Sequence, residues 1–231
     1  MGDVTVNSYY LPADEADGRA VLDWAVKAMQ VYQKRIGPYP FTELDVVETP
    51  TTAGGIEYPG LVVISSELYS DPQQNRTLEF ATVHEVAHQW FYSVVGDDQV
   101  NTPWMDESLV QMVALLYEED ANGPEAASFV SQRLFQAGYD RAKQENEDMP
   151  IGLPVSAYTD RQYAEIVYSK GPLFFDAVRK QIGDDKFNLF LQTYYSRFKY
   201  NIARPEDMLQ LLKEIGGPEI QPFYDQWVLG K

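Results

Sequence analysis

The amino-acid sequence predicts an α+β fold in which strands come first and helices follow. Two stretches in the first third, 41–49 and 61–66, are rich in β-branched residues, as strands are. From about residue 76 onward, apolar residues recur at helical spacing, and Pro and Gly separate most of the segments. A small sheet-bearing part followed by a helical part is typical of a fold with segregated elements. A chain of 231 residues is long enough to bury a sizeable core.

The sheet-bearing part is expected to contain one long helix. Residues 3–10 alternate enough to form a short strand or an extended lead-in. Apolar positions then recur at helical spacing over 14–36, and Gly37 and Pro38 end that helix. The two β-branched strands come next, and a loop rich in Gly and Pro joins them.

The helical part begins with a segment that contains both histidines of the chain. Thr77 is the expected N-cap of this helix, which runs to about Val95 with Gly96 near its end. Further helices are expected at 103–120, 124–145, 162–182, 184–199, 205–215 and 218–228.

Composition excludes several classes of function. The net charge of -17 argues against nucleic acids and anionic membrane surfaces as partners. Because the chain has no cysteine, it has neither disulfides nor thiolate metal sites, and a transition metal would need His and carboxylate ligands. The sequence has no apolar run of 18 residues, so no membrane insertion is expected within this segment. Its first residues lack the pattern of a signal peptide, and the compartment stays open.

The segment ATVHEVAHQWF (81–91) has the pattern of a zinc site. Residues four apart on a helix differ by about 40° around the axis and about 6 Å along it, so His84 and His88 can reach one ion. Glu85 lies beside that face, where it suits a water molecule as general base. Apolar neighbours are expected to bury the helix, and a buried pair of histidines without a partner would be costly.

A catalytic zinc site needs a third protein ligand, and Glu107 in WMDESL lies nineteen positions after His88. HEVAHQWF followed by WMDES resembles the H-E-x-x-H-x18-E signature of the aminopeptidase N family of gluzincins. The resemblance implies that Glu107 is the third ligand of one Zn²⁺ per chain. It also implies a thermolysin-like zincin catalytic domain, with a small mixed sheet followed by a mostly helical half.

The loop GGIEYPG (54–60) resembles the G-x-M-E-N exopeptidase motif of that family, with Ile56 in place of Met and Tyr58 in place of Asn. The resemblance implies that Glu57 binds the free α-amino group of a peptide, because a fixed carboxylate pairs with an ammonium group. Gly54 and Gly55 are expected to let the backbone approach the peptide closely. The missing Asn weakens inference about substrate contacts more than about the type of reaction.

YAEIVYSKG (163–171) resembles the segment with the family's catalytic tyrosine in Y-x-K-G, which implies that Tyr168 stabilises the oxyanion. Tyr163 is a possible neighbour that would contact the substrate. The chain departs from many relatives at Ala114, where they place an acidic residue, so support of the zinc ligands is expected to differ.

Family members usually have a large β-domain before this region, which implies a division of the chain into 1–13 and 14–231. The first part is expected to lead in from a missing N-terminal β-domain, and the second to be the metallopeptidase catalytic domain. The expected partners are peptides with a free N-terminus and other domains of the same full-length protein. Two alternatives stay open: a gluzincin endopeptidase, and a zinc-binding interaction module without turnover.

Overall fold

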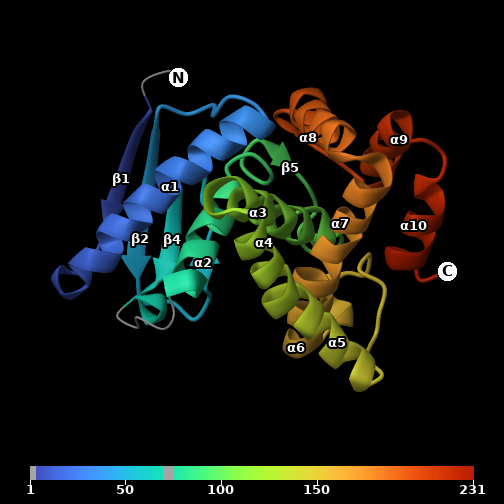
Figure 1. Cartoon of the computed structure of the whole chain (residues 1–231), viewed down its shortest axis with the longest axis horizontal. Helices are drawn as coiled ribbons and strands as arrows, with labels where there is room; N and C mark the ends of the chain where they lie inside the picture. Colours follow the sequence, from blue (N-terminus) through green and yellow to red (C-terminus); the bar gives the residue numbers. More distant parts are fainter. Residues whose placement is uncertain (1–3, 70–74) are drawn as a thin grey trace. The chain divides into compact units, whose positions relative to one another are not determined.

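The computed structural model describes residues 4–69 and 75–231, and it contains two compact units, Met1–Val94 and Val95–Lys231. The first unit contains a four-stranded sheet with two long helices, and the second is mostly helical (Figure 1). The predicted α+β class is therefore confirmed. Throughout the two described ranges, every helix is too short or too polar to span a lipid bilayer.

The sheet of the first unit has the strand order β1-β2-β4-β3. β1 and β4 both pair parallel with β2, while β3 pairs antiparallel with β4 at the edge. The bounds are Thr5–Tyr9 (β1), Glu43–Thr49 (β2), Gly55–Ile56 (β3) and Leu61–Ser65 (β4). The strands predicted at 3–10, 41–49 and 61–66 are confirmed, except that Asp3 lies outside the described residues. β3 is a strand of two residues inside the predicted loop.

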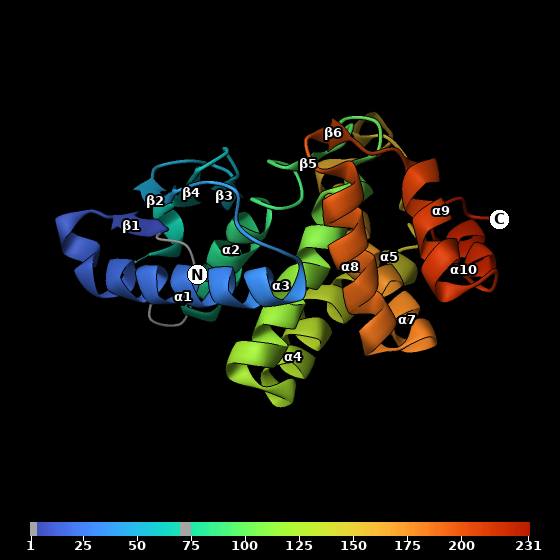
Figure 2. The same ribbon diagram turned by 90° about the horizontal axis from the view of Figure 1, so that it is seen from above.

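Two helices, α1 (Glu15–Arg35) and α2 (Asn75–Ala87), pack together on one face of this sheet (Figure 2). α1 confirms the helix predicted at 14–36. Its core-facing side chains recur every three or four residues, as a helix that buries one face requires: Val21, Ala25, Ala28, Met29 and Tyr32. The Tyr32 hydroxyl donates a hydrogen bond to the carbonyl of Val83 at 2.9 Å, which ties α1 to α2.

Helix α2 differs from its prediction at both ends. It ends at Ala87, not near Val95, and Thr77 lies inside the helix and is not its N-cap. Beyond Ala87 the second and third backbone amides bond three residues back instead of four, and Tyr92 then takes a φ of 126°. This bend buries Trp90, whose Nε1 donates to a carbonyl in the turn after α1 at 2.9 Å. Apolar periodicity could not predict the bend, because the buried apolar pattern continues past Ala87 with Trp90, Phe91 and Val94.

The second unit contains eight of the helices that the described residues form. Their bounds are Glu107–Asn122 (α3), Pro124–Val130 (α4), Ala137–Gln144 (α5), Asp160–Glu165 (α6), Gly171–Ile182 (α7), Asp184–Phe198 (α8), Pro205–Gly216 (α9) and Ile220–Trp227 (α10). Two short parallel strands, β5 (Val95–Gly96) and β6 (Asn201–Ile202), were not predicted.

Two of the predicted helices in this unit contain π-helical turns. The segment predicted at 124–145 consists of α4, the π-helical η4 (Ser131–Gln136) and α5. The segment predicted at 162–182 consists of α6, the π-helical η6 (Ile166–Lys170) and α7. A π turn inserts an extra residue into the helix and is often found at functional sites.

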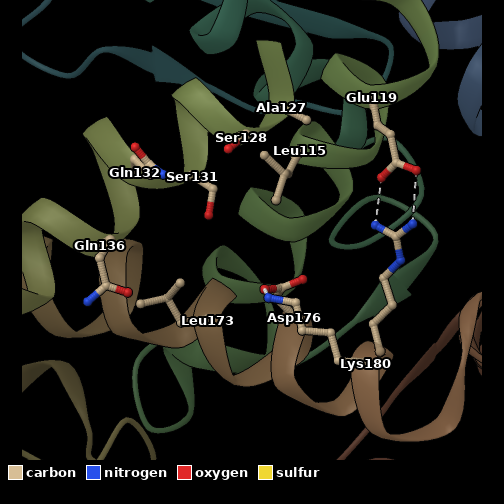
Figure 3. A pocket seen from close by; sticks show the side chains of 11 residues that line it. Leu115, Glu119, Ala127, Ser128, Ser131, Gln132, Gln136, Leu173, Asp176 and Lys180 are labelled. Carbon is tan, nitrogen blue, oxygen red and sulfur yellow. Dashed lines mark hydrogen bonds and ion pairs between the residues drawn. The ribbon is translucent and has the colours of Figure 1, made fainter. Parts of the chain in front are cut away.

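A pocket of about 430 Å³ lies in the second unit among α3, α4, η4 and α7. Figure 3 shows Glu119, Asp176 and Lys180 among the side chains that line it. Arg179 on α7 makes a two-pronged contact with Glu119 on α3, at 2.7 and 3.0 Å, and Lys180 pairs with Asp176 at 2.6 Å. The cations of this pocket are therefore balanced by neighbouring carboxylates, and Arg179 ties α7 to α3.

Candidate active site

The two histidines of the chain meet in the first unit, at the end of α2. His84 and His88 are buried, their rings are nearly perpendicular at 86°, and their Nε2 atoms lie 3.1 Å apart. His88 Nδ1 lies 3.2 Å from the carbonyl oxygen of Phe91. Because a carbonyl can only accept, this contact places the proton on Nδ1 and leaves the Nε2 lone pair to face His84.

This geometry fits zinc. Two nitrogens that share a tetrahedral zinc ion at its usual bond length lie about 3.3 Å apart, close to the 3.1 Å between His84 Nε2 and His88 Nε2. Two imidazole nitrogens at this distance need a proton or a cation between them. The predicted buried surroundings are also confirmed, since these apolar neighbours are all buried: Val83, Val86, Ala87, Trp90, Phe91 and Val94.

Glu85 lies between the two histidines in sequence, and its side chain is buried. Strand β3, in the loop before β4, passes directly over this side chain. A Cβ at Gly55 would overlap the carboxylate of Glu85, whereas a Cβ at Gly54 would meet open space. The absence of a side chain at Gly55 therefore makes room for the Glu85 carboxylate. The expectation that Gly54 and Gly55 let the backbone approach a peptide stays a prediction.

Gln89, which directly follows His88, fastens the loop that contains Glu57. Its side chain is fully buried; Nε2 donates to the carbonyl of Tyr58 at 3.1 Å and Oε1 accepts from the amide of Gly60 at 2.8 Å. Glu57 itself is half-buried and directly precedes this clamped segment. Gln89 has no role in the predicted site, although a polar residue in the apolar run VAHQWF indicates a need for buried partners.

In the second unit, Glu107 is the first residue of α3 and is half-buried. The helix N-terminus favours its negative charge. Its neighbour Asp106 is buried and accepts a hydrogen bond from Gln99 Nε2 at 2.6 Å. Ala114, one of the departures from the family pattern, is fully buried in the same helix.

The two predicted tyrosines lie together in the second unit. The rings of Tyr163 and Tyr168 meet edge to face with centroids 5.5 Å apart, and both side chains are half-buried. Burial raises the pKa of the Tyr163 phenol, and the negative charges of Glu107 and Asp106 raise it further. Tyr163 is therefore a neutral hydrogen-bond donor at physiological pH. The second unit thus brings Glu107 and Tyr163 within electrostatic reach of each other, with Tyr168 beside Tyr163.

Tyr168 lies in the π turn η6, and the two residues that follow it are anchored. Ser169 Oγ donates to the carbonyl of Leu134 at 3.0 Å. The buried Lys170 donates to the carbonyl of Met149 at 2.7 Å and pairs with Asp148. The Ser and Lys of the Tyr-Ser-Lys-Gly motif therefore hold the turn. These roles of Ser169 and Lys170 could not be predicted from the motif, because their partners lie about twenty or more positions away in the sequence.

The chain is similar in sequence to a known protein family and to known aminopeptidases. The model of the peptidase family M1 domain matches residues 20–227. The chain is 27% identical to aminopeptidase M1-B of rice, Oryza sativa subsp. japonica, over 91% of its own length. It is also 27% identical to mitochondrial aminopeptidase 2 of Saccharomyces cerevisiae over 97% of its length. In both comparisons it spans 25% of the relative.

Solved structures share the fold. The M1 zinc metallopeptidase from Deinococcus radiodurans superposes with a TM-score of 0.69 at 24% identity, over 89% of this chain and 43% of that one. The yeast LTA4 hydrolase in complex with bestatin superposes with a TM-score of 0.76 at 19% identity, over 98% of this chain and 38% of that one. The family match covers most of the chain, and the chain therefore belongs to peptidase family M1.

Proposed function

We propose that this chain is the catalytic region of a zinc aminopeptidase that removes the first residue of peptides. The observation that carries the proposal is the pair of buried histidines with Nε2 atoms 3.1 Å apart and Glu85 between them in sequence. Membership of peptidase family M1 supports it. The relatives named aminopeptidases are longer proteins, of which this chain spans about a quarter, 25%.

His84, His88 and Glu107 would hold one Zn²⁺ per chain. Each offers one ligand atom, and two imidazoles with one carboxylate are a common donor set of catalytic zinc. The spacing of nineteen positions from His88 to Glu107 supports the third ligand. When bound, zinc polarises a water molecule and the scissile carbonyl.

The remaining residues have distinct roles in this proposal. Glu85 takes a proton from the attacking water and delivers it to the leaving amine. Tyr168 donates a hydrogen bond to the oxyanion, and Tyr163 packs against its ring next to the substrate. Glu57 accepts the α-ammonium group of the substrate, and the clamp by Gln89 supports this role because it fixes the loop to the segment just after α2.

A single assay tests the function. The chain is given leucine p-nitroanilide and its N-acetylated form, with and without the chelator phenanthroline and with zinc added back. We expect hydrolysis of the free amine alone, its loss with chelator, and its return with zinc. Cleavage of the acetylated substrate would identify an endopeptidase. Stoichiometric zinc binding without turnover of either substrate would identify an interaction module, and both results overturn the proposal.

A further inference from the structure

The π turn η6 leaves one backbone carbonyl that its own helix cannot satisfy. The amide of Gly171 donates to the carbonyl of Ile166, five residues back. In the same pattern the carbonyl of Val167 would need the amide of Pro172, and proline has no N–H. Val167 is fully buried, so an unpaired carbonyl here would be costly.

A side chain from α3 supplies the missing donor. The Ser108 hydroxyl donates to the carbonyl of Val167 at 2.6 Å, and Ser108 is itself fully buried. The close crossing of the two helices requires Gly171, because a Cβ there would overlap Oγ and Cβ of Ser108. The π turn is thus held on α3 by three residues together: Ser108, Gly171 and Pro172.

The two residues of this hydrogen bond are sequence neighbours of residues in the proposed site. Ser108 directly follows Glu107, and Val167 directly precedes Tyr168. We infer that Ser108 is a positioning residue, and that its hydroxyl holds Tyr168 at a fixed place relative to Glu107. The inference rests on the proposed function and adds to it a residue that touches neither substrate nor metal. If the π turn relaxed into a regular α-helix, the register would shift by one residue. The side chains that follow would then rotate by about 100° around the helix axis.

The test is a double-mutant cycle on the zinc-loaded chain: wild type, Ser108→Ala, Tyr168→Phe and the double variant. We expect Ser108→Ala to lower kcat by about ten- to a hundredfold, since a misplacement of about 1 Å has effects of this size, and to change KM less than about twofold. In the Tyr168→Phe background the same change should have no further effect. Equal losses in both backgrounds, or a loss confined to KM, overturn the inference.

Two further variants separate positioning from packing. The double variant Ser108→Gly, Gly171→Ala has a Cβ at position 171 instead of position 108, and it lacks the hydroxyl. We expect it to lose kcat as Ser108→Ala does; recovery of wild-type kcat would overturn the inference. Ser8→Ala is the matched control, because Ser8 Oγ donates to the carbonyl of Gly18 at 2.8 Å between β1 and α1. It should lower thermal stability without lowering kcat.

Hydrogen exchange gives a readout that needs no turnover. In Ser108→Ala the backbone amides of 166–171 and of Leu173 should exchange faster than in wild type, whereas those of α9 should not change. Unchanged exchange in η6 overturns the inference even if the chain is inactive. Suppose that the wild-type chain turns over no substrate while exchange in η6 still depends on Ser108. This result would refute the proposed function and would still support the hydrogen bond from Ser108 as the contact that holds η6.

Discussion

At the scale of single residues, the candidate site contains side chains that meet through local helix geometry and side chains that support them from distant positions in the sequence. Helix geometry alone brings His84 and His88 together, and the structure places their Nε2 atoms 3.1 Å apart. Gln89 and Ser108 could not be found this way. Their partners lie 31 and 59 positions away in the sequence, at Tyr58 and Val167, and only the fold determines those contacts.

The proposed role of Glu85 as general base predicts that a variant can lose turnover and still bind the metal. Glu85→Gln keeps the size of the buried side chain but cannot take a proton, so we expect kcat to fall by about a hundredfold or more while zinc stays bound. Steady-state kinetics and the zinc content per chain measure the two effects. Glu79→Gln on the same helix is the control and should change kcat less than about twofold. A zinc-loaded Glu85→Gln variant with wild-type kcat would show that Glu85 is not the base.

At the scale of elements, apolar periodicity predicted where helices occur but not how they are interrupted. The segment predicted as one helix over 162–182 contains η6, whose register depends on Pro172 and on the distant Ser108. Likewise α2 ends at Ala87 because tertiary contacts bury Trp90 beyond it. In both segments the apolar pattern continues through the interruption, since core packing needs buried residues on either side of it.

The contact between the segment just after α2 and the loop before β4 predicts that Gln89 matters for both stability and substrate selection. Gln89→Met keeps the volume but leaves the carbonyl of Tyr58 and the amide of Gly60 without their partner. We expect the free energy of unfolding to fall by about 2 kcal/mol, measured by urea denaturation. If the loop positions Glu57 to bind the substrate amine as we propose, KM for leucine p-nitroanilide should also rise.

Gln30→Met is the matched control, since Gln30 is exposed on α1 in the same unit. It should leave both the unfolding free energy and KM unchanged within error. A Gln89→Met variant as stable as this control would show that the clamp contributes nothing. A loss of stability with unchanged KM would limit Gln89 to a structural role.

At the scale of the whole molecule, the order of strands and helices was enough to predict the α+β class. The three longer strands were predicted from composition, but the two-residue strands β3, β5 and β6 were not. Such short strands exist only through pairing with distant segments, so the local sequence contains little signal for them. The division at residues 13 and 14 and the partnership with other domains stay predictions.

Buried tyrosines predict how the stability of the whole chain depends on alkaline pH. Burial raises the pKa of Tyr158 and of Tyr224 to about 12, and it raises the pKa of Tyr194 well above its usual value. The unfolded phenol titrates near pH 10, so between about pH 10 and 12 the folded chain binds more protons than the unfolded chain. Stability from these groups is therefore fully present below pH 10 and is lost as the pH rises toward 12.

We expect the midpoint of urea unfolding to be constant from pH 8 to about pH 9.5 and to fall steadily above pH 10. Tyr224→Phe keeps the ring that packs edge to face against Trp104, with centroids 6.0 Å apart, but removes one titrating phenol. Its midpoint should therefore fall less steeply than that of wild type. Tyr200→Phe, at a side chain that is 66% exposed, is the control and should follow the wild-type curve. A midpoint that stays flat to pH 11 would mean that the buried phenols do not control stability in this range.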